Sequence, residues 1–292
     1  MDLLALTHNV HYDYPSPVFL GPHIFRLSPS FPSRFCLKDY SLHISPLPQT
    51  LHWQSDLFGN RVARAVFAAR TSALDVTMTA TFCWQETNPL DFLLEETAVQ
   101  WPPLYAENLV SPLAPYLQAT EDGPLFRAFV EKLREGPAST VAFLAYAAQQ
   151  IATTVRYTCR LDPGIQDAET TLGKRTGSCR DSAWLFVQAA RRLGFATRFV
   201  SGYLIELAAK VGDEALGADT AALHAWADVV LPGAGWVAVD PTSGLFAGAD
   251  HIPLAAAPEP ALVEPFLGSC ERQATHWHYS HSLQRLGCCV GH

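Results

Sequence analysis

The sequence predicts an α+β protein, in which an antiparallel β-sandwich precedes a domain of helices and strands. Residues 73–82 alternate apolar and polar side chains with a period of two, and proline and glycine punctuate the rest of residues 1–86. Residues 124–134 and 139–155 then look helical, the second with one apolar face, and strand-like runs follow from 197–205 onward. A short sandwich followed by a mixed domain fits this order.

These patterns divide the chain into four parts. The β-rich domain covers residues 1–86, and a proline-rich linker with short helical turns covers 87–123. The second domain covers 124–256, and a C-terminal extension covers 257–292.

The composition is that of a folded, acidic protein. Hydrophobic residues make up 49% of the 292 residues, charged residues make up 16%, and the net charge is −8. A sizeable core is therefore expected. Because no long basic run occurs, neither nucleic acid nor an anionic membrane is an expected partner.

The start of the chain resembles no export signal. The first ten residues lack a basic segment and a long apolar run, and no apolar stretch reaches the roughly 18 residues that cross a membrane. We therefore expect a cytoplasmic protein. The seven cysteines are odd in number and widely spaced, which favours free thiols over a disulfide framework.

The histidines and cysteines near the C-terminus do not predict a metal site. No carboxylate or C-x-x-C pair completes a known ligand spacing, so a strand with exposed histidines and a frayed tail is the simpler interpretation. No D-x-D-x-D-G loop for calcium occurs either. The residues concerned are His276, His278, His281, Cys288 and Cys289.

The most informative segment is a predicted helix that begins at a cysteine. Ser178 is a plausible N-cap, Asp181 completes a capping box, and Gly194 ends the helix. Cys179 then lies in the first turn, where free backbone N–H groups and the helix dipole favour a thiolate. Its own backbone N–H is the natural first donor of an oxyanion hole.

A nucleophilic cysteine needs a histidine and a third group that orients the imidazole. His224 begins one predicted strand and Asp240 ends the next, and a Pro-Gly-Ala-Gly loop joins the two strands. If Leu231 faces Trp236 across this loop, Asp240 lies opposite Ala227, three positions from His224. A bulge or a twist must then close the gap.

Each of these residues has a simpler interpretation when taken alone. A cysteine at a helix start is usually a small buried hydrophobic residue, a histidine at a strand start is more often a surface or capping residue, and an aspartate before proline is a turn former. The joint order favours the catalytic interpretation, in which Cys179, His224 and Asp240 form a triad.

Four further residues are candidates for a substrate cleft. Trp226 points to the same side of its strand as His224, so it either shields the histidine from water or packs in the core. Tyr203 either lines the cleft or packs. Asp181 either tunes the site electrostatically or only caps the helix, which is the simpler use, and Ser178 lies beside the nucleophile.

Three blocks of the sequence resemble bacterial transglutaminase-like proteins. Residues 177–185 (GSCRDSAWL) resemble the cysteine block of that family, residues 223–229 (LHAWADV) its histidine block, and residues 232–244 (PGAGWVAVDPTSG) its aspartate block. The resemblance covers most of residues 8–270. Supporting segments are 11–18, 22–29 and 56–60 before these blocks, and 251–255 and 258–260 after them.

The resemblance implies a papain-like, transglutaminase-like catalytic domain, in which a cysteine helix packs on an antiparallel sheet that carries the histidine and the aspartate. Several relatives have Val-Cys-Gln-Asp where this chain has Ser-Cys-Arg-Asp at residues 178–181. The latter version resembles a subgroup whose module begins a longer chain with an ATP-grasp-related region. A product of an ATP-grasp-type ligase is therefore a possible substrate.

The function expected from this combination is thiol-dependent hydrolysis of a peptide, isopeptide or other amide bond, through an acyl-enzyme on Cys179. A protein-glutamine transglutaminase, in which an amine replaces water, would use the same triad. A non-catalytic module that retains the fold is the third alternative. No cofactor is expected, because this chemistry needs no electron carrier.

Overall fold

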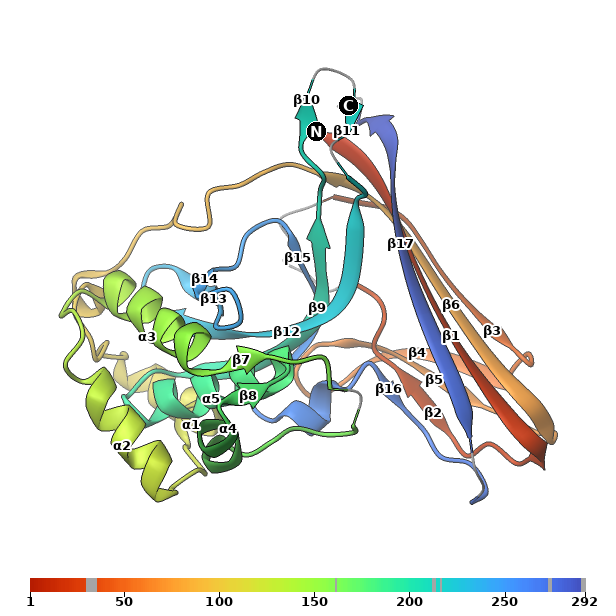
Figure 1. The fold of residues 1–292 in the computed structure, drawn as a ribbon, viewed down its shortest axis with the longest axis horizontal. Coiled ribbons are helices and arrows are strands. Elements are labelled where there is room, and N and C mark those ends of the chain that lie inside the picture. The colour runs from red at the N-terminus through yellow and green to blue at the C-terminus, as the bar shows by residue number, and fades with distance from the viewer. Residues whose placement is uncertain (30–35, 161, 212–213, 216, 273–274, 290–292) are drawn as a thin grey trace.

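The computed structural model describes residues 1–29, 36–160, 162–211, 214–215, 217–272 and 275–289. Two bodies of structure pack against each other (Figure 1): a β-sandwich, and a sheet covered by helices. This α+β arrangement confirms the predicted fold class. In the described residues, no helix is both long and apolar enough to cross a bilayer.

The sandwich consists of two antiparallel sheets with the strand orders β17-β1-β6-β3 and β16-β2-β5-β4. The inward side chains of β6 are buried at every second position, as the period of two predicts. The strands are β1 (Asp2–Val18), β2 (His23–Phe25), β3 (Cys36–Ser45), β4 (Thr50–Ser55), β5 (Arg61–Val66), β6 (Thr71–Trp84), β16 (Phe266–Leu267) and β17 (His276–Cys288).

The end of the chain returns to the sandwich. Strand β16 pairs with β2, and β17 runs antiparallel to β1 over most of its length. Part of the predicted C-terminal extension, 257–292, is therefore built into the N-terminal sheets. The expected strand with exposed histidines is present, since His276 and His278 are both exposed.

A disulfide between Cys83 and Cys289 ties the end of β17 to β6. The expectation of free thiols is therefore wrong for this pair, whereas Cys36, Cys159, Cys179, Cys270 and Cys288 are free. Local spacing gave no sign of the bond, because it joins residues 206 positions apart. Disulfides are typical of oxidising compartments, so this bond weakens the argument for a cytoplasmic protein.

The second body has a five-stranded antiparallel sheet with the order β14-β13-β12-β9-β15. Two further two-stranded sheets are formed by β7 with β8 and by β10 with β11. The strands are β7 (Arg156–Tyr157), β8 (Thr176–Gly177), β9 (Thr197–Glu206), β10 (Lys210–Val211), β11 (Glu214–Ala215), β12 (Thr220–Leu231), β13 (Gly235–Asp240), β14 (Leu245–Phe246) and β15 (His251–Ala257).

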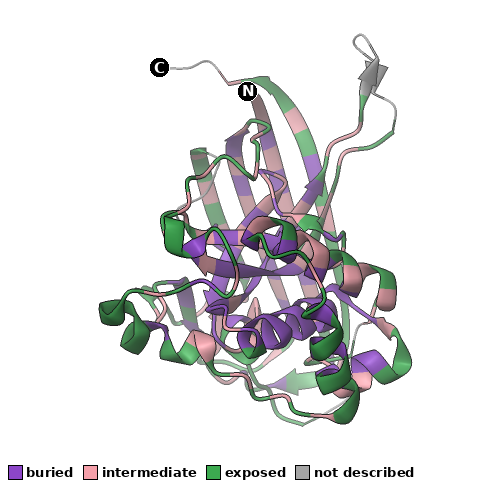
Figure 2. Ribbon diagram, turned by 90° about the vertical axis from the view of Figure 1, so that its left-hand side faces the viewer, coloured by how far each residue is buried: buried purple, intermediate pink, exposed green. Residues whose placement is uncertain are grey.

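Helix α5 lies at the centre of this body and packs on β12 and β9. It is buried on nearly every side, and Figure 2 shows a buried helix surrounded by exposed ones. The predicted helices occur as α2, α3 and α5. The helices are η1 (Glu96–Ala98), α1 (Glu107–Leu117), α2 (Pro124–Leu133), α3 (Thr140–Thr154), α4 (Ala168–Lys174), α5 (Cys179–Arg192) and η2 (Pro260–Val263).

Removing the disulfide with Cys289→Ser should lower the free energy of unfolding by about 3 kcal/mol, because the bond closes a long loop in the unfolded chain. Urea unfolding under non-reducing conditions measures this change. Cys36→Ser, which alters an exposed free thiol, is the matched control and should leave stability within about 0.5 kcal/mol. Equal stability of the two variants would contradict the bond.

Candidate active site

The start of α5 places Cys179 in the first helical turn. Ser178 is the extended N-cap residue, and its backbone N–H donates to the Asp181 carboxylate at 2.8 Å, as a capping box requires. The Ser178 hydroxyl donates to the same oxygen at 2.9 Å. Gly177 is needed just before this turn, because a Cβ there would lie 2.9 Å from the Cβ of Asp181.

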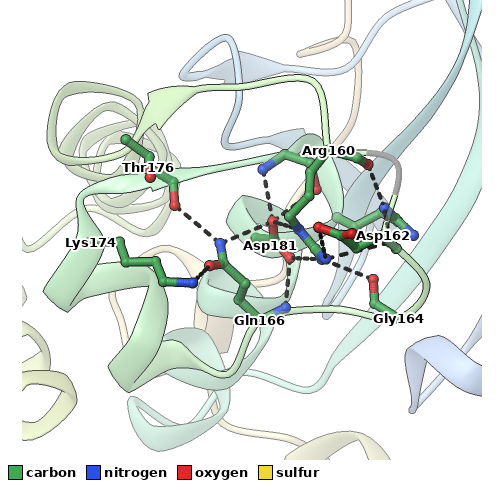
Figure 3. A network of polar contacts seen from close by, with 9 residues as sticks. Arg160, Asp162, Gly164, Gln166, Lys174, Thr176 and Asp181 are labelled. Carbon is green, nitrogen blue, oxygen red and sulfur yellow. Dashed lines mark hydrogen bonds and ion pairs between the residues drawn. The ribbon is translucent and has the colours of Figure 1, made fainter.

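The Asp181 carboxylate also holds the loop that precedes α4 (Figure 3). Arg160 donates to both of its oxygens, from Nε at 3.1 Å and from Nη2 at 2.9 Å, and the backbone N–H of Gln166 donates at 2.7 Å. Burial alone would raise the pKa of Asp181, but Arg160 and these hydrogen bonds lower it. The carboxylate is therefore an anion that joins the helix start to the loop.

This arrangement corrects the assignment of Asp181 and Ser178 to a substrate cleft. Asp181 has no exposed surface and Ser178 is 4% exposed. Both side chains are turned into the capping network, so they position Cys179 and do not line a surface.

The hairpin between β12 and β13 brings Asp240 to the same face of the sheet as His224. Leu231 pairs with Gly235, and Ala227 pairs with Val239. The loop is one residue shorter than the sequence analysis assumed, because Gly233 and Gly235 both adopt left-handed φ angles, of 91° and 75°. One position further along β13, Asp240 lies opposite Trp226. Trp226 is two residues from His224 and on the same side of β12, so no bulge is needed to bring Asp240 and His224 together.

Cys179, His224 and Asp240 meet in one line of contacts. The imidazole of His224 donates from Nε2 to Asp240 Oδ2 at 3.1 Å, and Cys179 is close enough to His224 to raise the pKa of the imidazole. The other Asp240 oxygen accepts the backbone N–H of Thr242 at 2.8 Å, which fixes the carboxylate in the Asp-Pro-Thr turn. The side chains of His224 and Asp240 are only 8% and 2% exposed.

The charges of this group stabilise one another. Burial alone would lower the pKa of His224, but its hydrogen bonds with Asp240 and Cys179 raise it to about 10. Burial alone would raise the pKa of Asp240, but His224 and His251 beside the carboxylate lower this pKa well below its ordinary range. The site therefore holds an imidazolium and a carboxylate away from water.

A second histidine, which the sequence analysis missed, also contacts Asp240. His251 donates from Nε2 to Asp240 Oδ2 at 3.4 Å and from Nδ1 to Asp250 Oδ1 at 2.8 Å. Since both ring nitrogens face carboxylates, the imidazolium is favoured, and the pKa of His251 is raised although burial opposes this. No local signal could have found it, because β15 reaches Asp240 only through its pairing with β9.

The ligand-type atoms of His224, Asp240 and His251 lie within 4.8 Å of one another, as in a metal site. Nε2 of His224 and both ring nitrogens of His251 already have carboxylate partners, Asp240 and Asp250. The geometry therefore favours a hydrogen-bonded chain over a metal centre.

Trp226 and Tyr203 lie on opposite sides of the sheet. Trp226 is 2% exposed and packs its ring 5.1 Å from that of His251 and 6.3 Å from that of His224. It belongs to a small buried apolar cluster and at the same time packs against the two imidazoles, so both expected roles remain compatible with its place. Tyr203 has no exposed surface and hydrogen-bonds His8 of the sandwich at 2.7 Å, so it packs between the two bodies and lines no cleft.

Two family profiles match the chain. The bacterial transglutaminase-like N-terminal region matches residues 4–82, and the transglutaminase-like superfamily matches residues 127–241. The second match contains Cys179, His224 and Asp240.

A curated relative and a solved structure are also similar to the chain. The protein-glutamine γ-glutamyltransferase of Pseudomonas aeruginosa is 27% identical over an alignment of 186 residues, which covers 61% of this chain and 27% of that protein. The chain thus spans little more than a quarter of that relative. A crystal structure from Cytophaga hutchinsonii, provisionally assigned as a cysteine protease, has a TM-score of 0.71 at 16% identity over 99% of this chain and 92% of that one. The two share a fold.

Asp181→Asn should lower the free energy of unfolding by about 3 kcal/mol at pH 7, because it leaves Arg160 without its buried partner. Asp162→Asn changes an 81%-exposed carboxylate and should cost less than about 0.5 kcal/mol. Since the pKa of Asp181 is lowered by folding, its contribution is complete above the unfolded value of about 3.9 and is lost progressively as the pH falls through the lower folded value. Denaturant unfolding at pH 7 and pH 3 tests both statements; an Asp181→Asn cost that does not shrink at pH 3 would contradict the ion pair.

His251→Gln should raise the pKa of His224 further, because it removes the positive charge that shares Asp240 with it. Asp240→Asn should have the opposite effect, since burial then opposes protonation without a compensating carboxylate. NMR titration of ¹³C-labelled histidine measures both shifts. A His224 pKa that falls in His251→Gln would show that His251 is not a cation in the folded protein.

Proposed function

We propose that this chain, which belongs to the bacterial transglutaminase-like superfamily, hydrolyses a peptide, isopeptide or other amide bond through an acyl-enzyme on Cys179. The observation that carries this proposal is the line of contacts Cys179–His224–Asp240 at the first turn of a buried helix. A scaffold would not need an ionised imidazole between a thiol and a buried carboxylate, which argues against the non-catalytic alternative.

In the first step, the sulfur of Cys179 attacks the amide carbonyl and a tetrahedral intermediate forms. The backbone N–H of Cys179 is positioned to donate to its oxyanion. His224 gives its proton to the departing amine, the C–N bond breaks, and a thioester remains. Asp240 keeps the imidazole oriented throughout.

In the second step, His224 is neutral and accepts a proton from water, which attacks the thioester carbonyl. The C–S bond breaks and the acid leaves, and the thiolate of Cys179 and the protonated imidazole of His224 are restored. Trp226, which is stacked on the ring of His224, and the buried side chain of His251 limit water around Asp240, which preserves the charge of the carboxylate.

Amine transfer is the second candidate, because the curated relative is a protein-glutamine γ-glutamyltransferase. In that reaction a primary amine replaces water in the second step, with no change in the triad. Hydrolysis is preferred because it requires no second substrate site. The Ser-Cys-Arg-Asp block at residues 178–181 supports the further proposal that an ATP-grasp-type ligase makes the amide.

A peptide thioester supplied as an activated acyl donor should acylate Cys179, and water should release the acid. Intact-mass spectrometry should detect the acyl-enzyme in the wild-type protein and not in Cys179→Ala. His224→Gln should slow acylation by about 100-fold or more, since it removes the group that moves the proton.

The exposed Cys159 supplies the control, because Cys159→Ser should leave acylation unchanged. Equal acylation of wild type and Cys179→Ala would end the enzymatic proposal. The same assay with millimolar primary amine separates the two reactions: an acyl–amine adduct as the main product would replace hydrolysis by transfer.

A further inference from the structure

Strand β17 presents one aromatic face that the sandwich does not cover. Its odd-numbered side chains share one side of the strand, and they change from buried to exposed along it. Leu283 is 7% exposed and packs in the sandwich core, whereas Tyr279 is 43% exposed and Trp277 is 44% exposed. The rings of Trp277 and Tyr279 are stacked, with centroids 5.7 Å apart.

The loop beside α5 forms the opposite wall of a groove. Asp162 and Pro163 face Trp277, His278 and Tyr279 across a space of about 480 Å³. The groove therefore lies between the two bodies of the protein, where ligand sites commonly occur.

This wall is held in place by the residues that surround the nucleophile. Arg180 donates from Nη2 to the backbone carbonyls of Arg160 and Asp162, at 2.8 and 3.0 Å. Arg160 in turn pairs with Asp181 at 2.9 Å. The groove wall and the start of α5 are thus one hydrogen-bonded unit, so the groove has a fixed position relative to Cys179.

A third exposed ring lies on the strand pair that precedes the cysteine. Tyr157 is 56% exposed and lies on β7, which pairs with β8 just before Cys179. Burial raises the pKa of Tyr157, and the charges of Cys179 and Tyr279 add to the effect. Tyr157 pairs with Gly177, so it lies on the strand pair that leads into the first turn of α5.

We propose that this groove binds the acyl-donor segment of the substrate, as an extended peptide with an aromatic side chain close to the scissile amide. Stacked indole and phenol rings favour another aromatic ring. Strand β17 is an edge strand of its sheet, and such a strand suits an extended partner. The proposal rests on the proposed function, because it names the substrate class for the site at Cys179.

The test uses pairs of peptide thioesters in which one residue is either phenylalanine or alanine. One pair varies the residue nearest the acyl carbon, and a second pair varies the next residue. Acylation rates of Cys179 are followed by intact mass. At one of these positions the wild-type protein should prefer phenylalanine by about tenfold, as expected for burial of a ring. In Trp277→Ala and in Tyr279→Ala this ratio should fall toward one.

Two variants serve as controls. Trp277→Phe should restore most of the preference, which separates loss of a ring from loss of folding. Trp53→Ala removes a 38%-exposed ring on β4 and should retain the full preference. Equal wild-type rates for both side chains, or an unchanged ratio in Trp277→Ala, would overturn the proposal.

A second measurement separates this proposal from the proposed function. If no thioester acylates Cys179, the enzymatic proposal fails, and the groove is then tested by fluorescence anisotropy with labelled phenylalanine and alanine peptides on Cys179→Ala protein. Tighter binding of the phenylalanine peptide, lost in the added Trp277→Ala change, supports the groove. Equal binding of the two peptides overturns the proposed groove. Self-association of the wild-type protein that Trp277→Ala abolishes also overturns it, because a second copy of the chain would then occupy the groove.

Discussion

The buried carboxylate of Asp181 is the constraint on which the rest of the site depends. It accepts hydrogen bonds from the N-cap residue of α5 and from the loop at Arg160 and Gln166. One anion thus fixes where the helix begins, and so where the sulfur of Cys179 lies. It also fixes the loop that faces β17. Since a buried anion without partners is costly, the helix start and the loop must form together.

A second buried carboxylate organises the charges opposite the sulfur. Asp240 is shared by two imidazoles, His224 toward the thiol and His251 toward Asp250. The two rings are 5.7 Å apart, so each cation opposes protonation of the other while the carboxylate favours both. His251 therefore moderates the basicity of His224, which matters because a general acid must release its proton as well as hold it.

The sequence predicted what local patterns encode and missed what only packing creates. The capping box around Ser178 and Asp181, the helix from Cys179 and the alternation in β6 are short-range signals, and each element formed as expected. The predicted hairpin register was wrong by one residue because two left-handed glycines, Gly233 and Gly235, set the loop length. His251 and the Cys83–Cys289 bond depend on strands that meet far along the chain, so no spacing rule could reveal them.

Strand β17 belongs to the sandwich, whereas its aromatic rings form a wall beside the other body. This arrangement affects which function is lost first when the protein unfolds. This strand is held by backbone bonds to β1 and by the disulfide near its end, yet its rings face the other body. The nucleophile and its partners lie wholly on that other body. If the sandwich opened first under mild denaturation, the thiol would keep its reactive neighbours but lose the aromatic wall. Under the proposed function, partial unfolding would then remove the preference for aromatic substrates before it abolished turnover.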